Sequence, residues 1–156
     1  MVDLAVRLLI ADDIPACERI LRDLPEWFGI ETSVMEYVES LAVLPGFVAI
    51  VDGELAGFLA LKEHNPDASE VHVMAVQRDS HRKGAGRALL RAAEAYLVET
   101  ARLLQVKTLG PSHPDPGYAR TRSFYVAMGF IPLEETTSIW GAENPCLVMV
   151  KPVTSG

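Results

Sequence analysis

The hydrophobic and polar positions along the chain alternate with two periods, which predict strands and helices in a mixed α/β domain. Short apolar or β-branched runs, typical of strands, occur at residues 6–11, 47–51, 54–63, 70–76, 105–109, 130–139 and 146–150. Helical patterns cover residues 12–25, 33–44, 86–102 and 121–128. The predicted order is therefore strand, two helices, three strands, helix, strand, helix and two strands.

Short local motifs predict where several of these elements begin and end. Asp12 or Asp13 is expected to cap the first helix, and Ser33-Val34-Met35-Glu36 has the form of a capping box for the second. Asp52-Gly53 between two apolar runs predicts a tight hairpin, because both turn positions favour positive φ. Gly129 is expected to end the last helix.

Length and composition narrow the class of protein. A chain of 156 residues suits a single domain over 1–156. It has no apolar run of the ~20 residues that cross a bilayer, and its start lacks the pattern of a secretion signal. Its two cysteines form no disulfide framework, so we expect a cytoplasmic protein without a membrane partner.

The net charge and the spacing of the histidines indicate which partners and metal ions the protein is expected to bind. The net charge of −7 argues against binding nucleic acid and mildly favours a cationic partner. The histidines lack metal-site spacing with the cysteines, so no metal is expected. They are His64, His72, His81 and His113.

The main candidate site is a glycine turn between the predicted strand 70–76 and the helix after it. Gly84-Ala85-Gly86 leaves room for backbone N–H groups to converge at the positive end of the helix dipole. Such a turn binds phosphate, and Arg82, Lys83 and Arg87 add positive charge around it. The same spacing also suits a turn that merely connects strand to helix. A dinucleotide fold needs a third small residue, where Leu89 stands.

Two motifs in this order resemble those of the GNAT superfamily of N-acetyltransferases. Val73-Met74-Ala75-Val76 followed by Arg82–Leu90 resembles the acetyl-CoA motif, and Phe124–Phe130 resembles the late Phe-Tyr-x-x-x-Gly-Phe element. The resemblance covers nearly the whole chain. It implies a mixed α/β fold with a central twisted sheet of about six to seven strands, flanked by about four helices. It also implies acetyl-CoA as the co-substrate.

The resemblance assigns the cofactor contacts to a continuous segment. It implies cofactor-binding roles for Met74, Ala75, Val76, His81, Arg82, Lys83, Gly84, Ala85, Gly86 and Arg87. In the family the Met74 amide would meet the thioester oxygen and the Val76 amide would hold the pantetheine arm. Two positions depart from the family pattern. His81 stands where Gln or Arg is usual, and Tyr118 stands where an Asn often holds pantetheine, so Ser112 or the Tyr118 hydroxyl is expected to take that role.

The resemblance also implies the catalytic groups. Glu70 lies four residues before Met74, where relatives carry a glutamate base, and it is the expected base. A base is needed because a lysine-like amine has a reference pKa of ~10 and is an ammonium at neutral pH. Two alternatives stay open: Glu70 is a solvated carboxylate at the start of the strand, or His72, two residues on, is the base. Tyr125 is the expected acid for the departing CoA thiolate, and core packing is its alternative.

These observations predict an enzyme that transfers an acetyl group from acetyl-CoA directly to a primary amine. The alternative is a non-catalytic acyl-CoA-binding module of the same fold. The acceptor is a small molecule, a peptide or a protein, and the family resemblance allows a homodimer. Candidate residues for lining the acceptor site are Glu26, Trp27, Phe28, Glu31 and Trp140.

Overall fold

The computed structural model describes residues 2–154, which form seven strands and four α-helices in the predicted order. The strands are β1 Leu4–Leu8, β2 Gly46–Val51, β3 Glu54–Asn65, β4 Ala68–Val76, β5 Leu103–Leu109, β6 Ile131–Thr136 and β7 Cys146–Pro152. The helices are α1 Ile14–Arg22, α2 Glu31–Leu41, α3 Ala85–Leu97 and α4 Pro116–Ala127. Among residues 2–154, no helix combines the length and the hydrophobicity needed to cross a membrane.

Contacts group the chain into two compact units, which β3 and β4 both enter. Unit 1 contains residues 2–62 and His72–Leu97, and unit 2 contains Glu63–Val71 and residues 98–154. The strands are hydrogen-bonded in the order β1-β2-β3-β4-β5-β7-β6, with parallel pairing between β4 and β5. This mixed sheet with its helices confirms the predicted fold class. The single domain over 1–156 stays a prediction.

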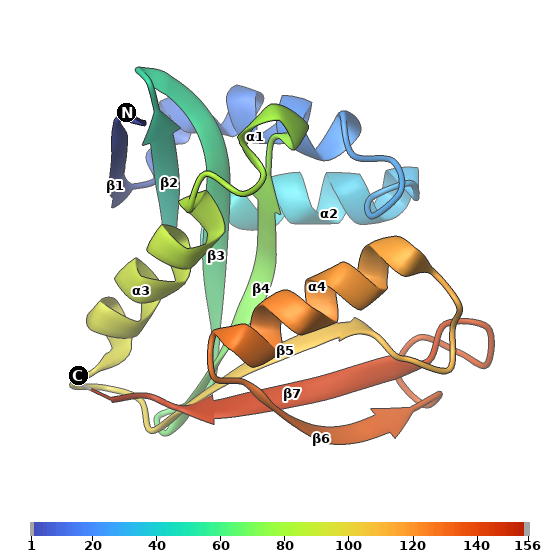
Figure 1. Ribbon diagram of the computed structural model, residues 1–156. Helices are drawn as coiled ribbons and strands as arrows, with labels where there is room; N and C mark the ends of the chain where they lie inside the picture. The colour runs from blue at the N-terminus through green and yellow to red at the C-terminus, as the bar shows by residue number, and fades with distance from the viewer. Residues whose placement is uncertain (1, 155–156) are drawn as a thin grey trace. The chain divides into compact units, whose positions relative to one another are not determined.

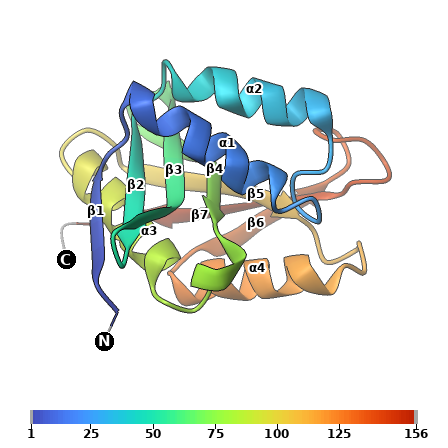
Figure 2. The ribbon, with the colours of Figure 1, turned by 90° about the horizontal axis from the view of Figure 1, so that it is seen from above.

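Unit 1 is built around a hydrophobic cluster beneath two neighbouring helices. α1 and α2 lie side by side, as Figure 2 shows, and α3 contacts β1 and β2. β1, β2 and β3 pair antiparallel, and Asp52 and Gly53 form the β2–β3 turn with φ of 50° and 85°, as predicted. The cluster includes Cys17, Ile20, Leu21, Leu24, Val34, Leu41, Val48, Phe58, Val73 and Ala75.

Unit 2 is a small sheet with α4 against β5 (Figure 1). β5 pairs antiparallel with β7, and β7 pairs antiparallel with β6. The ladder between β4 and β5 joins Ala68–Glu70 to Leu103–Gln105 and extends no further. Residues of β5 alternate in burial, with Leu104, Val106 and Thr108 buried.

The N-terminal caps of α1 and α2 differ from those predicted from local sequence motifs. α2 begins at Glu31 with Ile30 as its N-cap, so the predicted capping box at Ser33 is wrong. Glu31 is held there by Arg22 at 2.7 Å. Asp13 is the N-cap of α1, but its side chain does not cap that helix. Its carboxylate instead accepts from the Ile10 amide at 2.8 Å and from Arg7.

The start of α4 also lies earlier than the predicted residue 121. α4 begins at Pro116, because the Asp115 side chain accepts from the Gly117 and Tyr118 amides. Proline suits the first helical position, where its missing N–H leaves no bond unmade. Gly129 follows α4 with φ 98°, as expected for a C-terminal glycine.

Several other element boundaries moved by a few residues. α3 ends at Leu97 instead of near residue 102, since the amides of residues 102 and 103 bond to the Asp67 carbonyl and already lead into β5. On α3 Leu89 and Leu90 are buried, whereas Tyr96 is 51% exposed. β1 lies at Leu4–Leu8 instead of 6–11, and β6 ends at Thr136 instead of 139.

Candidate functional site

The turn between β4 and α3, in unit 1, has a backbone that suits an anion. Arg82 and Gly84 have left-handed φ angles of 70° and 86°. The first hydrogen bond of α3 runs from the Ala88 amide to the Gly84 carbonyl at 3.0 Å. In the described part of the chain, the N–H groups of residues 85–87 have no backbone acceptor. They therefore remain available to a ligand at the positive end of the helix.

The charge around this turn is positive and exposed. The side chains of Arg82, Lys83 and Arg87 are all exposed. Converging N–H groups together with cationic side chains fit a pyrophosphate, the charged part of acetyl-CoA that such a helix start binds. The predicted cofactor segment is thus compatible with that ligand.

The imidazole of His81 forms a hydrogen bond within the turn between β4 and α3. Its Nε2 lies 2.8 Å from the Val76 carbonyl oxygen, so this nitrogen carries the proton and donates. Its ring also meets the edge of Trp27 at a centroid distance of 6.2 Å. The side chain therefore acts on the conformation of the turn. Any contact of His81 with the cofactor stays a prediction.

The end of β4 directs alternate amides to opposite edges of the strand. The Gln77 amide donates to the Ala56 carbonyl at 2.7 Å, which fixes the β3 side. Since N–H groups alternate along a strand, the Met74 and Val76 amides point away from β3. Gly57 allows the close approach of β3 here: a Cβ would lie 3.1 Å from the Ala75 carbonyl oxygen. The role of Gly57 depends on strand pairing, so no local sequence motif indicates it.

Glu70, in unit 2, is a buried carboxylate with two partners on one oxygen. It is 7% exposed. Its Oε1 lies 2.6 Å from Nε2 of His64 and accepts from Nζ of Lys107 at 3.1 Å. No side chain or amide in residues 2–154 donates to Oε2. The alternative of a solvated Glu70 is therefore wrong. His64 and Lys107 were missed because only the strand register brings them to this carboxylate.

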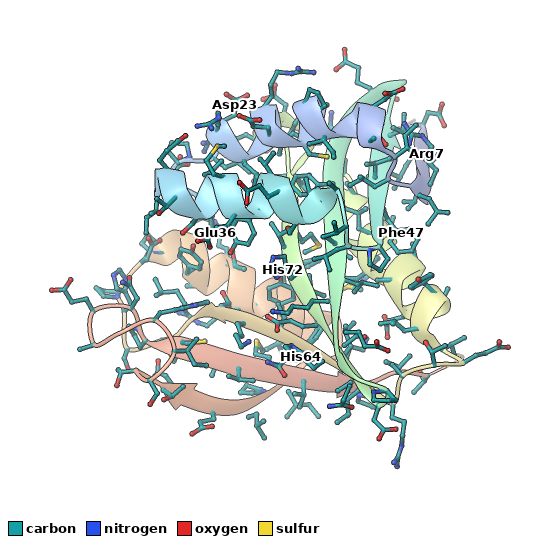
Figure 3. The ribbon with its side chains drawn as sticks, turned by 180° about the vertical axis from the view of Figure 1, so that it is seen from behind. Arg7, Asp23, Glu36, Phe47, His64 and His72 are labelled. Carbon is teal, nitrogen blue, oxygen red and sulfur yellow. The ribbon has the colours of Figure 1, made fainter. Side chains whose placement is uncertain are left out.

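His72 lies in unit 1, packed beneath α2. Its ring meets Tyr37 of α2 edge-on at a centroid distance of 5.4 Å and an angle of 71°. His72 is labelled in Figure 3. The side chain is half-buried. This contact suits a packing role for His72.

Tyr125 is buried on α4. It is 6% exposed and meets Phe124 and Phe130 edge-on, each at a centroid distance of 5.4 Å. Burial raises the pKa of its phenol well above the usual value, and the neighbouring Tyr118 adds to the shift. The phenol therefore holds its proton throughout the neutral pH range.

A polar pocket of about 450 Å³ lies in unit 2, between the loop after β5 and the β6–β7 loop. Glu135 forms part of its wall and accepts from the Ser112 hydroxyl at 2.6 Å and from the Ser112 amide at 3.0 Å. These bonds lower the pKa of Glu135, so it stays charged. Gly110 makes room for it, because a Cβ there would overlap Oε2 of Glu135. Glu143 adds a second carboxylate to the pocket.

This arrangement changes several sequence-based expectations about ligand contacts. The Ser112 hydroxyl donates to Glu135, so its proton is not available to the pantetheine arm. Glu26 pairs with Arg78 at 2.6 Å and Glu31 with Arg22 at 2.7 Å, so both predicted acidic lining residues already have counter-charges. Trp140 is 43% exposed. Residues 2–154 contain no group of three or more His, Cys, Asp or Glu side chains placed to hold a metal ion.

The mixed sheet and a helix start whose unpaired N–H groups suit an anion are compatible with a CoA-dependent acyltransferase. The family model of the acetyltransferase (GNAT) domain matches residues 42–132, more than half of the 156-residue chain. The chain therefore belongs to the GNAT family of acetyltransferases, which confirms the resemblance and the prediction of an acyltransferase. No functionally curated protein matches this sequence.

Solved structures with similar folds cover nearly the whole chain. A GNAT-family protein from Desulfovibrio desulfuricans has a TM-score of 0.81 at 20% identity, over 97% of this chain and 100% of its own. The ribosomal-protein-S18-alanine N-acetyltransferase from Escherichia coli has a TM-score of 0.79 at 18% identity, over 99% and 96%. A GNAT acetyltransferase from Elizabethkingia anophelis with acetyl-CoA bound has a TM-score of 0.72 at 15% identity, over 96% and 97%. At these identities the likeness establishes the fold alone.

Proposed function

We propose that this acyltransferase moves an acetyl group from acetyl-CoA to a primary amine by direct attack on the thioester, with Glu70 as base and Tyr125 as acid. The observation that carries this proposal is the burial and hydrogen bonding of the Glu70 carboxylate. Its carboxylate is buried, one oxygen is held by two donors, and the other accepts no bond within residues 2–154. An anchored carboxylate with one unclaimed oxygen is suited to take a proton from a bound ammonium.

The cofactor is proposed to bind through the backbone of unit 1. The N–H groups of residues 85–87 and the exposed Arg82, Lys83 and Arg87 would hold the pyrophosphate. The Met74 amide, directed away from β3, would donate to the thioester oxygen as it gains charge, an interaction worth about 3 kcal/mol in comparable sites. The Val76 amide would hold the pantetheine arm. The acetyl-CoA bound to the Elizabethkingia protein supports this choice of ligand.

The protons released during the reaction define a separate task for each of the two proposed catalytic residues. An ammonium that becomes an amide gives up two protons, of which one ends on the CoA thiol and one in solvent. Glu70 would take the first proton at Oε2. Tyr125 would donate from its phenol to the leaving sulfur. Because the raised pKa of Tyr125 disfavours complete transfer to a thiolate, whose conjugate thiol has a reference pKa of about 8.5, Tyr125 would contribute chiefly a hydrogen bond to the developing charge. The second proton of the amine would then reach the thiolate through solvent.

The variant Tyr125→Phe is expected to lower kcat by about 100-fold or less. It keeps the ring and its contacts with Phe124 and Phe130 but removes the donor. A thiolate is a tolerable leaving group, so the loss should fall at the low end for general acids. Steady-state kinetics and a melting curve check the result, with acetyl-CoA affinity and Tm expected to change little. Full activity would show that Tyr125 serves packing alone.

The acceptor is proposed to be a cationic amine, either a small molecule or an exposed peptide terminus or lysine. The support is the pocket of unit 2, where Ser112 and Gly110 fix the charged Glu135 and Glu143 adds a second carboxylate. Nucleic acid and membrane are not expected partners at a net charge of −7. A cytoplasmic location and a homodimer also stay predictions.

An amine panel tests the function as a whole. We expect thiol release from acetyl-CoA with at least one member of a set comprising a polyamine, an aminoglycoside, a peptide with a free N-terminus, and neutral analogues with a single amine. Mass spectrometry should find one added acetyl group. Amines with a second positive charge should have the lower KM, and Glu135→Gln should remove that advantage. Acetyl-CoA binding without thiol release from any amine would favour the non-catalytic binding module.

A further inference from the structure

His64 makes the shortest hydrogen bond to the Glu70 carboxylate, although the two residues lie on different strands. His64 is the second-last residue of β3, and Glu70 is the third residue of β4. Both residues belong to unit 2, and Figure 3 labels His64. The side chain of His64 is 34% exposed and that of Glu70 is 9% exposed. The contact therefore joins a carboxylate withdrawn from water to an imidazole that water still reaches.

We propose that His64 is a positioning residue for the base: it fixes Oε1 of Glu70 so that Oε2 is the atom that receives the substrate proton. The inference rests on the proposed role of Glu70. In the neutral imidazole with its proton on Nε2, the ring donates a charge-assisted bond to Oε1, consistent with the short distance of 2.6 Å. The planar ring also restricts rotation of the carboxylate.

Lys107 shares the same oxygen but contributes differently. Its Nζ lies 3.1 Å from Oε1, at the end of a flexible stem, and it supplies a counter-charge more than a fixed direction. In the described part of the chain, Cys146 on β7 is a further titratable group that interacts with Glu70. Burial raises the pKa of this thiol, and the negative charge of Glu70 adds to the shift, whereas Lys107 opposes it. Cys146 thus stays neutral, and His64 and Lys107 supply the donors to Glu70.

The alternative is that the cluster stabilises the strands and has no part in the reaction. The two roles differ in how a change at residue 64 combines with a change at residue 70. If His64 acts only through the carboxylate, its removal has no further effect once the base is gone. If it stabilises the sheet, it affects both backgrounds equally and lowers Tm in step with activity.

The test is a double-mutant cycle with acetyl-CoA and the amine that gives the highest turnover in the panel. His64→Leu is expected to lower kcat about tenfold, with the KM for acetyl-CoA within about twofold. His64→Gln retains an N–H donor and should recover most of the loss. In the Glu70→Gln background, His64→Leu should change kcat by less than about twofold. The matched control Lys62→Leu, at an exposed position of the same strand, should leave kcat unchanged.

The outcomes separate this inference from the proposed base. Loss of activity in Glu70→Gln together with full activity in His64→Leu overturns the positioning role and leaves the base standing. Equal fractional losses from His64→Leu in both backgrounds also overturn it. Full activity in Glu70→Gln refutes the base itself. A crystal structure of His64→Leu needs no acceptor: we expect more than one Glu70 conformer, and a single unchanged conformer contradicts the inference.

Discussion

Replacing Glu70 with glutamine is expected to lower kcat about 100-fold at pH 7 while acetyl-CoA affinity changes little. Glutamine keeps the shape of the side chain and an oxygen that His64 and Lys107 can bond, but it takes no proton at neutral pH. The deficit should shrink as the pH approaches ~10, the reference pKa of a lysine-like amine, because free amine is then abundant. The measurement is a pH–rate profile of wild type and variant with the same acceptor.

Two controls make this result specific. Glu134→Gln removes an exposed carboxylate from β6 and should leave the profile unchanged. Calorimetric titration with acetyl-CoA reports whether Glu70→Gln still binds the cofactor. An unaltered pH–rate profile in Glu70→Gln would transfer the role to His72, despite its packing against Tyr37, or to a chain of water molecules.

Gly86→Val is expected to weaken acetyl-CoA binding about 100-fold in a protein that still folds. Gly86 is the second residue of α3, where the free N–H groups lie, and its φ is not among the positive angles. Valine is therefore allowed by the backbone, but its side chain would occupy the space through which a pyrophosphate reaches those groups. Hydrogen bonds to charged groups contribute about 1.5–3 kcal/mol each, so losing one or two accounts for this factor.

Ala95→Val is the matched control, because it places the same β-branched residue at an exposed position of α3. Valine has a lower helix propensity than alanine and a higher one than glycine, so neither variant should unfold the helix, and Ala95→Val should bind acetyl-CoA as wild type does. Calorimetry with both variants, after circular dichroism has shown that they fold, gives the comparison. Wild-type affinity in Gly86→Val would move the phosphate site away from this turn. Gly84 is a poorer test because its φ of 86° makes any side chain strained there.

The features predicted correctly from the sequence depend on residues close together in the chain. The order of the elements follows from hydrophobic periods, and the β2–β3 turn follows from Asp52-Gly53, whose φ angles match the prediction. The helix start after Gly84 is likewise local. Ser33 shows the limit of such motifs: a hydroxyl three residues before a carboxylate fits a cap, but the ion pair between Arg22 and Glu31 accompanies an earlier start.

The surroundings of the candidate site depend on strand register, which no short motif encodes. Lys107 reaches Glu70 because the parallel ladder sets Glu70 opposite Gln105, two residues before Lys107. Shifting that ladder by one residue would send Lys107 to the other face. The site of Glu70 on its strand was predictable, whereas its partners, and the contact of Glu135 with Ser112, emerged only from the three-dimensional structure.

The close approach of Glu135 to Gly110 couples two positions that are 25 residues apart in the sequence. A Cβ at position 110 would overlap Oε2 of Glu135, so alanine at this position would displace the carboxylate from Ser112. Because Glu135 is exposed, its side chain can rotate away from alanine, so Gly110 keeps Glu135 bonded to Ser112 and is not needed to keep the strand folded.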